Sequence, residues 1–437
     1  MVFIGTDVVE VRAWGRTVGA VARTASTRGL AFEFDPGWVR SGLQISPLMM
    51  PLEVRRIYSY PGLNRDTWHD LPPAIADSLP DRFGNAIIDA EFARRGAGIG
   101  EATALDRLVY TGARAMGALE FVPDDGPRTP PPTMLDIGQL VTVARDVVAG
   151  RLADERLGDE HESTTALEQL LSIGTSAGGV RAKAVVDIDP VTREVRPGQI
   201  ARAGSESWLL KFDGVGRDSE LGTSRDYGRI EYAYSLMARA AGIEMTETRL
   251  LEEGGRAHFL TRRFDRPGGA QRLHTQTLCA LSVLDYNERG AHDYAQLFQA
   301  IDALGLDEAA RVQAFRRMVF NWMAANCDDH TKNHAFVMDE TGAWSLSPAY
   351  DITHAHNPQG EWTSQHLMAV GGKFTGLTRA DLLTFAERHA VLGAGALIDE
   401  VAEAVSGWRG YAEAAGLSES TTREIEDDLL IDKFARR

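Results

Sequence analysis

The stretch that most constrains this chain is a polar segment of nine residues, Asn-Cys-Asp-Asp-His-Thr-Lys-Asn-His, at positions 326–334. Apolar residues dominate residues 312–325 and predict a helix that ends where this polar loop begins. Residues 334–338 and 344–346, joined by an Asp-Glu-Thr-Gly turn, predict a hairpin. The hairpin leads to Asp351, so a helix and a hairpin are expected to bring the polar loop near one further carboxylate.

Asp328 and Asn333 lie five positions apart within the polar loop. Protein kinases have the same spacing between the Asp and the Asn of their catalytic loop, H-R-D-x-x-x-x-N. There the Asp accepts the proton of the substrate hydroxyl, the Asn holds a magnesium ion, and a later Asp holds magnesium as well. Asp351 is placed in the sequence to be that later Asp. Acidic residues are also frequent in the turn that ends a helix. The spacing alone is therefore equally consistent with an ordinary turn that has no catalytic role.

The chain has 437 residues, which predicts two or three domains. Its net charge of −16 disfavours direct, non-specific binding of the whole molecule to nucleic acids or membrane surfaces. The two cysteines, Cys279 and Cys327, give no disulfide or zinc-finger framework and suit a reducing compartment. The N-terminus lacks the pattern of a signal peptide, and no apolar run approaches the roughly 18 residues of a spanning helix. We therefore expect a soluble, cytoplasmic protein with no membrane partner.

The order of predicted elements indicates an α+β fold, in which an N-terminal α/β module precedes a two-lobed, protein-kinase-like domain with a mainly helical C-terminal lobe. The module is expected at residues 1–125, and a Pro- and Gly-rich linker follows it at 126–132. Residues 126–265 predict the kinase N-lobe, and residues 266–437 predict the helical C-lobe with the catalytic loop. Strands are predicted at 8–14, 17–22, 31–34, 120–122, 182–188, 208–212, 245–251 and 257–263, and helices at 72–95 with a break at 77–81, 104–111, 134–151 and 230–241.

The kinase-like order begins with a segment rich in Gly, Ser and Thr, residues 172–179. Glycines let backbone N–H groups approach phosphate oxygens, and Arg181 and Lys183 add positive charge. Lys211 lies in the next apolar strand and Glu231 at the start of the next helix, where a kinase has a Lys that contacts the ATP phosphates and pairs with a Glu. Taken alone, the first segment fits an ordinary turn equally well, and Lys211 fits an edge-strand lysine that discourages aggregation.

His330 and His334 are four positions apart, which is also a spacing of metal ligands on a helix. The intervening Lys332 and Asn333 favour a loop over a helix, and no Glu occupies the position that a zinc protease requires. A metallohydrolase that uses His330, His334 and Asp328 is therefore the less favoured alternative to a kinase.

Together these residues resemble the HipA family, the serine/threonine-kinase toxins of bacterial type II toxin–antitoxin modules. The resemblance covers most of the chain, and the joint order and spacing of its motifs carry it. The N-terminal motifs are S-P-L-x-M-P at 46–51, A-D-S-L-P-D at 76–81 and G-A-L-E-F at 117–121. The kinase motifs are S-x-G-G-x-R-x-K at 176–183, L-K-F at 210–212, R-F-D-R at 263–266, D-D-H-x-K-N at 328–333 and P-x-Y-D at 348–351.

The resemblance implies an ATP- and Mg²⁺-dependent kinase in which Asp328 is the catalytic base and Asn333 and Asp351 hold magnesium. Ser176 matches a serine whose autophosphorylation ejects the loop and switches the kinase off, since a phosphate dianion there would repel the ATP phosphates. The adenine would be lined by the backbone of residues 262–264. The implied nucleotide-binding residues are Gly178, Gly179, Val180, Arg181, Ala182, Lys183, Lys211, Arg262, Arg263, Phe264, Asp265 at the nucleotide's edge, His330, Lys332, Asn333, Tyr350 and Asp351.

The resemblance also implies partners. The substrate would be a cytosolic protein, an aminoacyl-tRNA synthetase in the family, and its modification would halt translation. A small helix-turn-helix antitoxin would bind the chain, and DNA would be reached only through that antitoxin. The sequence departs from the family pattern at Ala182, where Pro is frequent, at Arg262, where an acidic residue is frequent, and at 274–277, where an acidic run is common. A non-catalytic, nucleotide-binding co-repressor is the other alternative, and the intact catalytic positions argue against it.

Overall fold

The computed structural model describes residues 5–23, 29–80, 82–98, 101–126, 135, 137–148, 181–192, 194–198, 204–215, 226–431 and 434. The chain divides into two compact units. Unit 1 comprises residues 1–216, 260–276 and 337–343, and unit 2 comprises residues 217–259, 277–336 and 344–437. The units are thus interleaved in the sequence, and the division at residues 125 and 265 stays a prediction.

Unit 1 contains a five-stranded sheet in the order β4-β3-β2-β1-β5. Strand β1 (Val8–Ala13) pairs antiparallel with β2 (Arg16–Arg23), and on its other side with β5 (Leu119–Val122). These three strands confirm the predictions at 8–14, 17–22 and 120–122. Strand β3 (Leu30–Phe34) pairs with β2 and with the short β4 (Ile57–Tyr58). Alternate residues of β1 are fully buried, as a strand with one face on a core requires.

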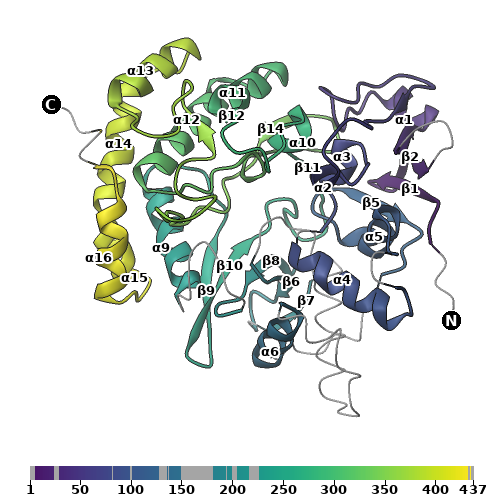
Figure 1. Ribbon diagram of the computed structural model, residues 1–437, viewed down its shortest axis with the longest axis horizontal. Helices are drawn as coiled ribbons and strands as arrows, with labels where there is room; N and C mark the ends of the chain where they lie inside the picture. Colours follow the sequence, from purple (N-terminus) through teal and green to yellow (C-terminus); the bar gives the residue numbers. More distant parts are fainter. Residues whose placement is uncertain are drawn as a thin grey trace. The chain divides into compact units, whose positions relative to one another are not determined.

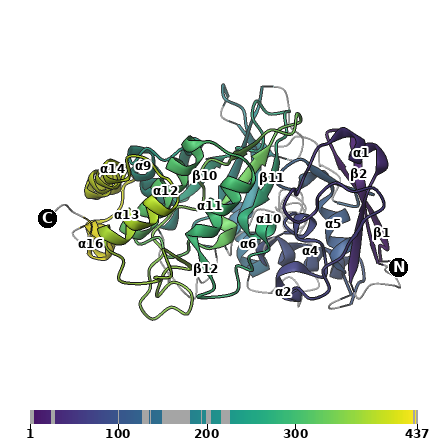
Figure 2. The same ribbon diagram turned by 90° about the horizontal axis from the view of Figure 1, so that it is seen from above.

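Helices of unit 1 pack on this sheet and on one another. Helix α5 (Ala104–Thr111) contacts β1 and β5, and Figure 2 shows it beside the sheet. A capping box formed by Thr103 and Asp106 begins this helix. Helix α4 (Arg82–Arg94) contacts α5 and α6 (Ile137–Val148). Helices α4, α5 and α6 confirm the helical stretches predicted within 72–95, 104–111 and 134–151. The shorter helices are α1 (Pro36–Ser41), α2 (Arg65–Trp68), α3 (Pro73–Ala76) and the 3₁₀ turn η1 (Gly112–Arg114).

A second five-stranded sheet has the order β7-β6-β8-β10-β9. Its strands are β6 (Lys183–Ile188), β7 (Val195–Pro197), β8 (Glu206–Lys211), β9 (Thr248–Glu253) and β10 (Arg256–Arg262). Four of these strands confirm the prediction. The sequence did not predict β7, because the Pro and Gly residues within 190–198 favour a turn. β7 is an edge strand, where Pro is tolerated, and three residues among turn formers give no readable period.

Unit 2 is mainly helical, as predicted for the C-terminal part. Helix α12 (Glu308–Met323) is the predicted apolar helix, and it packs against α11 (Tyr294–Ala303) and α14 (Ala394–Ser406). Helix α9 (Tyr227–Ala240) contacts α14 and α15 (Trp408–Ala414), and Figure 1 shows these helices side by side. The other helices are α10 (Leu278–Ser282), α13 (Arg379–Arg388), α16 (Glu419–Asp428) and the 3₁₀ turn η2 (Thr331–Asn333).

The predicted hairpin after the polar loop is confirmed as β13 (Ala335–Met338) and β14 (Trp344–Leu346). These strands form a three-stranded sheet with β11 (His274–Thr277), in the order β11-β13-β14. Strand β12 (His292–Asp293) pairs parallel with β15 (Met368–Ala369). The sequence did not predict β11, β12 or β15, because segments this short carry no periodic signal. Within the described ranges, no helix combines the length and the apolar character needed to cross a membrane.

Candidate functional site

The polar loop, residues 326–334, is fixed where it leaves α12. All residues from 317 to 323 of that helix are buried, so the helix end has little freedom. Tyr234 Oη on α9 donates a 2.7 Å hydrogen bond to the carbonyl oxygen of Ala324. Cys327 N donates to the carbonyl oxygen of Ala355 at 3.2 Å, which ties the start of the loop to the chain beyond Asp351.

Within the loop, Asn333 is bonded to the residue that kinase spacing pairs with it. Asn333 Nδ2 donates a 2.7 Å hydrogen bond to the carbonyl oxygen of Asp328, and Asn333 N donates to His330 O at 2.9 Å. These bonds fold the loop into a compact turn. The carboxylate of Asp328 is turned outward, with 47% of its side chain exposed, and its Oδ1 lies 3.7 Å from His330 Nε2. A half-exposed carboxylate beside an imidazole is accessible to a reacting hydroxyl group.

The chain that follows the hairpin returns to the same loop. Tyr350 Oη donates a 2.6 Å hydrogen bond to the carbonyl oxygen of Lys332. Ala349 N donates to Glu244 O at 2.8 Å, which fixes the residues just before Asp351 from their other side. Asp351 itself has a φ of +53°, in the left-handed region that a non-glycine residue rarely adopts. Strain of this kind persists where surrounding contacts impose it, often at functional sites.

The two histidines of the loop have different surroundings. His334 is 2% exposed and its ring packs against Tyr294 at 5.4 Å between ring centres, whereas His330 lies beside Asp328. Burial, followed by the charge of Arg317, lowers the pKa of His334 to about 3. In the part of the chain that the structure describes, no three His, Cys, Asp or Glu side chains form a group that could hold a metal ion. The ring of His334 is thus enclosed, whereas His330 lies beside the half-exposed Asp328.

Sequence reasoning missed a buried carboxylate next to Asp328. Asp329 is 1% exposed, and its side chain accepts hydrogen bonds from Tyr294 Oη at 2.9 Å and from His366 Nδ1 at 3.0 Å. The only sequence signal was the pair of consecutive aspartates, which does not reveal which of the two is buried. Two neighbouring carboxylates therefore face opposite environments.

The unit 1 residues predicted to bind phosphate are only partly described. Ser176, Gly178, Gly179 and Val180 lie outside the described residues, and their predicted roles stay predictions. β6 and β8 pair antiparallel in a register that puts Lys183 opposite Lys211, so both side chains belong to one face of the sheet. Lys183 is 1% exposed and Lys211 is 8% exposed, while Arg181 is half-buried and Ala182 is buried. The predicted pairing of Lys211 with Glu231 stays a prediction.

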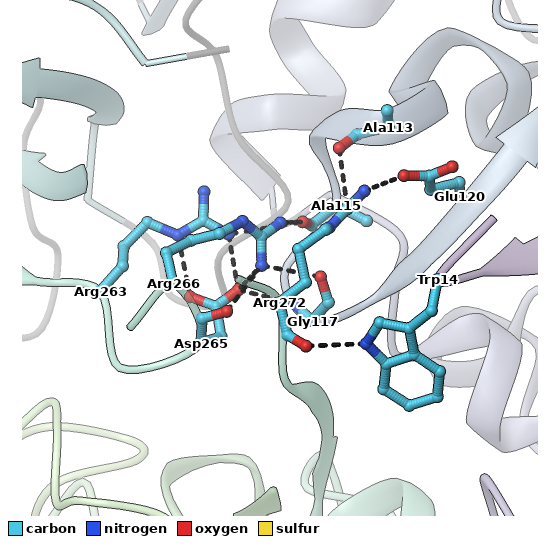
Figure 3. Close-up of polar contacts among 9 residues, drawn as sticks. All are labelled: Trp14, Ala113, Ala115, Gly117, Glu120, Arg263, Asp265, Arg266 and Arg272. Atoms are coloured by element: carbon cyan, nitrogen blue, oxygen red, sulfur yellow. Dashed lines mark hydrogen bonds and ion pairs between the residues drawn. The ribbon is translucent and has the colours of Figure 1, made fainter. Parts of the chain in front are cut away.

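The segment after β10 is held by a buried ion cluster (Figure 3). Asp265 is fully buried and accepts hydrogen bonds from Arg263 Nε at 2.9 Å and Nη2 at 2.7 Å and from Arg266 Nη1 at 2.6 Å. Gly117 N donates to the same carboxylate at 2.7 Å. Burial by itself would raise the pKa of Asp265, but the charges of the two arginines outweigh it and hold the pKa well below its usual range.

The guanidinium groups of this cluster reach across to the N-terminal sheet. Arg266 donates to Gly117 O at 2.8 Å and to Ala115 O at 3.1 Å. Arg272 donates to Ala113 O at 2.9 Å, and its own carbonyl oxygen accepts a 2.8 Å bond from Trp14 Nε1. Residues 113–117 and 263–272 are therefore locked together inside unit 1.

This cluster bears on the nucleotide-binding prediction for residues 262–265. The carboxylate of Asp265 is committed to the arginines, so a nucleotide contact by this residue would have to use its backbone. The side chain of Arg262 is 38% exposed, and Arg263 is buried in the cluster. Phe264 is half-buried. The adenine role of these residues stays a prediction.

The arrangement of β-sheet, apolar helix, polar loop and returning hairpin defines an α+β, protein-kinase-like fold. Residues 9–122 match the family model of the HipA N-terminal domain, and residues 175–408 match that of the HipA-like C-terminal domain. The second match alone spans more than half of the 437 residues. The chain therefore belongs to the HipA family.

The known proteins that are similar to this chain include a solved structure and a curated relative. HipA of Shewanella oneidensis MR-1, solved in a complex with HipB and operator DNA, matches over 98% of this chain and 97% of its own, with a TM-score of 0.65 and 16% identity, which is evidence for the fold. A protein of Sinorhizobium fredii named "Putative kinase Y4dM" is 28% identical over 246 residues, which is 51% of this chain and 56% of that protein. The match thus spans just over half of the length of that relative.

We predict that Asp265→Ala strongly destabilises the protein, because the substitution leaves Arg263 and Arg266 charged and unpaired inside unit 1. The expected loss is about 3–5 kcal/mol in the free energy of unfolding, measured by urea titration. Glu53→Ala is the matched control, since it removes the exposed ion pair with Arg56 and should cost about 0–1 kcal/mol. Equal losses for the two variants would contradict the structural role of the cluster.

A second prediction concerns acid stability. His334 is neutral in the folded protein down to a pKa of about 3, whereas in the unfolded chain it becomes protonated below about 6.5. Its contribution to stability is therefore present above pH 6.5 and is lost as the pH falls toward 3. Between pH 7.5 and 5, the His334→Gln variant should lose about 2 kcal/mol less stability than the unmodified protein in urea titrations. If the variant and the unmodified protein lose the same stability between pH 7.5 and 5, His334 is not a buried, neutral residue.

Proposed function

We propose that this chain is an ATP- and Mg²⁺-dependent protein serine/threonine kinase. The observation that carries the proposal is the bonding around the polar loop. Asn333 is tied to the backbone of Asp328, and Tyr350 is tied to the loop at Lys332, next to Asp351. Protein kinases transfer a phosphoryl group with a base for the substrate hydroxyl and oxygen ligands for magnesium. Membership of the HipA family supports the same conclusion.

In this proposal Asp328 accepts the proton of the substrate hydroxyl, for which its exposed carboxylate is suited. Asn333 and Asp351 would hold magnesium, because amide and carboxylate oxygens are the ligands that Mg²⁺ prefers. When bound, the ion neutralises charge on the transferred phosphoryl group. His330, Lys332 and Tyr350 would line the nucleotide from the loop side.

The remaining nucleotide contacts are assigned to unit 1. Lys211 and Lys183, which lie opposite each other on one face of their sheet, would supply positive charge for the phosphates of ATP. The backbone of residues 262–264 would line the adenine. The phosphate loop would consist of Gly178, Gly179, Val180, Arg181, Ala182 and Lys183.

The family also supplies the proposed partners. A small helix-turn-helix antitoxin would bind the chain and connect it to DNA; the similar HipA of Shewanella oneidensis MR-1 was solved with HipB and operator DNA. The protein would act in the cytoplasm on a protein substrate of the aminoacyl-tRNA synthetase class and so arrest translation. Autophosphorylation of Ser176 would end the activity, since a phosphate dianion would repel bound ATP.

The kinase activity is tested with γ-labelled ATP, Mg²⁺, the purified full chain and a cell lysate. We expect label on a lysate protein or on the chain itself, and Asp328→Asn should lower the rate by about 10²–10⁴-fold because it removes the base. Asp427→Asn, which changes an exposed carboxylate of α16, should leave the rate unchanged. Nucleotide binding without any transfer would favour the co-repressor alternative and overturn the kinase proposal.

The switch is tested by mapping phosphopeptides after prolonged incubation with ATP and Mg²⁺. We expect phosphate at Ser176, and we expect transfer by Ser176→Ala to continue after the unmodified protein has stopped. The control is Ser172→Ala, a change in the same Gly-, Ser- and Thr-rich segment. Phosphoryl transfer by this variant should stop at the same time as transfer by the unmodified protein. Phosphate found only at other positions, or inactivation of Ser176→Ala at the usual rate, would rule out this switch.

A further inference from the structure

The carboxylate of Asp329 is saturated with donors. Oδ1 accepts hydrogen bonds from Leu367 N at 2.7 Å and Met368 N at 3.4 Å, and Oδ2 accepts from Tyr294 Oη at 2.9 Å and His366 Nδ1 at 3.0 Å. None of the Asp329 side chain is exposed. A buried carboxylate is stable only when its charge and its lone pairs are matched in this way.

His366 supplies the matching charge. Its ring is stacked on Trp322 of α12, with 4.1 Å between ring centres and 15° between planes. Burial would lower the pKa of His366, but the charge of Asp329 outweighs burial and raises the pKa to about 10. The other groups that face this imidazole are Cys327, whose Sγ lies 3.9 Å from Nε2, and Tyr294 through its bond to the same carboxylate. The raised pKa favours a protonated imidazole beside the carboxylate of Asp329, with which it forms a buried pair at 3.0 Å.

Further hydrogen bonds connect the ion pair to α12, to the polar loop and to the β12–β15 strand pair. Tyr294 Oη accepts a 2.9 Å bond from Asn321 Nδ2 on α12, and Asn321 Oδ1 accepts a 2.9 Å bond from Asn326 Nδ2 at the start of the polar loop. Met368 belongs to β15, which pairs with β12 directly before Tyr294 opens α11. Two helices, one strand pair and the loop itself thus meet at a single buried carboxylate.

We propose that Asp329 is a positioning residue, which together with His366 holds the polar loop so that Asp328 points its carboxylate at the substrate hydroxyl. The inference deepens the proposed kinase function and rests on it. It follows from the contrast between neighbours, since Asp329 is wholly buried and the Asp328 side chain is 47% exposed. Because the two residues are joined by one peptide bond, anchoring the carboxylate of Asp329 restricts the backbone that carries the Asp328 side chain. Misplacing a reacting group by about 1 Å can cost about 100-fold in rate.

The test is a double-mutant cycle on the full chain, measured as the rate of phosphoryl transfer at saturating ATP. Asp329→Asn keeps the shape of the side chain but removes its charge, and it should lower the rate by about 10–100-fold. In the Asp328→Asn background, the same change should have no further effect, because Asp329 acts through Asp328. A purely structural role would lower the folded fraction equally in both backgrounds. Equal losses in both backgrounds, or an unchanged rate for Asp329→Asn alone, would overturn the inference.

Two further measurements keep the test decisive. Histidine NMR should show a protonated His366 ring at pH 8 in the unmodified chain and a neutral ring in Asp329→Asn; a neutral ring in both would contradict the ion pair.

If Asp329→Asn fails to fold, His366→Asn retains a donor near the position of Nδ1 without the charge, and it should lower the rate in the same non-additive way. Asp302→Asn, which breaks the surface pair with Arg311 between α11 and α12, is the control and should leave the rate unchanged.

The outcomes separate the two proposals. If the unmodified chain transfers no phosphate, the kinase proposal itself fails. If the unmodified chain transfers phosphate and Asp328→Asn abolishes it, but Asp329→Asn transfers at the normal rate, then only the positioning role fails.

Discussion

The conformation of the polar loop depends on burying one carboxylate, that of Asp329. Removing such a group from water is costly unless a counter-charge and several donors replace the lost hydration. His366, Tyr294 and two backbone amides meet this requirement together. Because these partners come from separate elements, they can be satisfied together only in one arrangement of the loop. Asp328 is then left facing outward, and the chemistry proposed for the chain uses that exposed neighbour.

Unit 1 contains a second buried carboxylate that is matched by opposite charges and hydrogen-bond donors. Asp265 is enclosed by Arg263 and Arg266 and accepts the backbone N–H of Gly117, which joins the segment after β10 to the N-terminal sheet. Buried ion pairs add little net stability compared with apolar packing, but breaking one of them leaves an uncompensated charge. In both units, then, a buried carboxylate fixes a segment to which the proposed function assigns substrate or nucleotide contacts. We infer that the two clusters serve mainly to specify conformation.

Sequence alone predicted the elements whose signal is periodic or local. The helix predicted at 312–325 and the hairpin after the polar loop are confirmed. Asp328 and Asn333, which the spacing singled out, are joined by a hydrogen bond within a turn. The role of Asp329 could not be predicted, because its partners Tyr294 and His366 lie 35 and 37 positions away in the chain. Asp265 bonds to its neighbours Arg263 and Arg266, but its contact with Gly117 spans 148 positions and gives no sequence signal. Short strands such as β7 have too few residues to show a period.

Whether this member of the HipA family is a protein kinase can be tested by following the γ-phosphate of ATP. Mass spectrometry of a reaction with isotopically labelled ATP, Mg²⁺ and candidate protein substrates would locate the label. We expect the labelled phosphate on a serine or threonine hydroxyl, and we expect this label to be lost when Mg²⁺ is chelated. Labelled phosphate found only as free inorganic phosphate, or ATP left intact, would contradict this expectation.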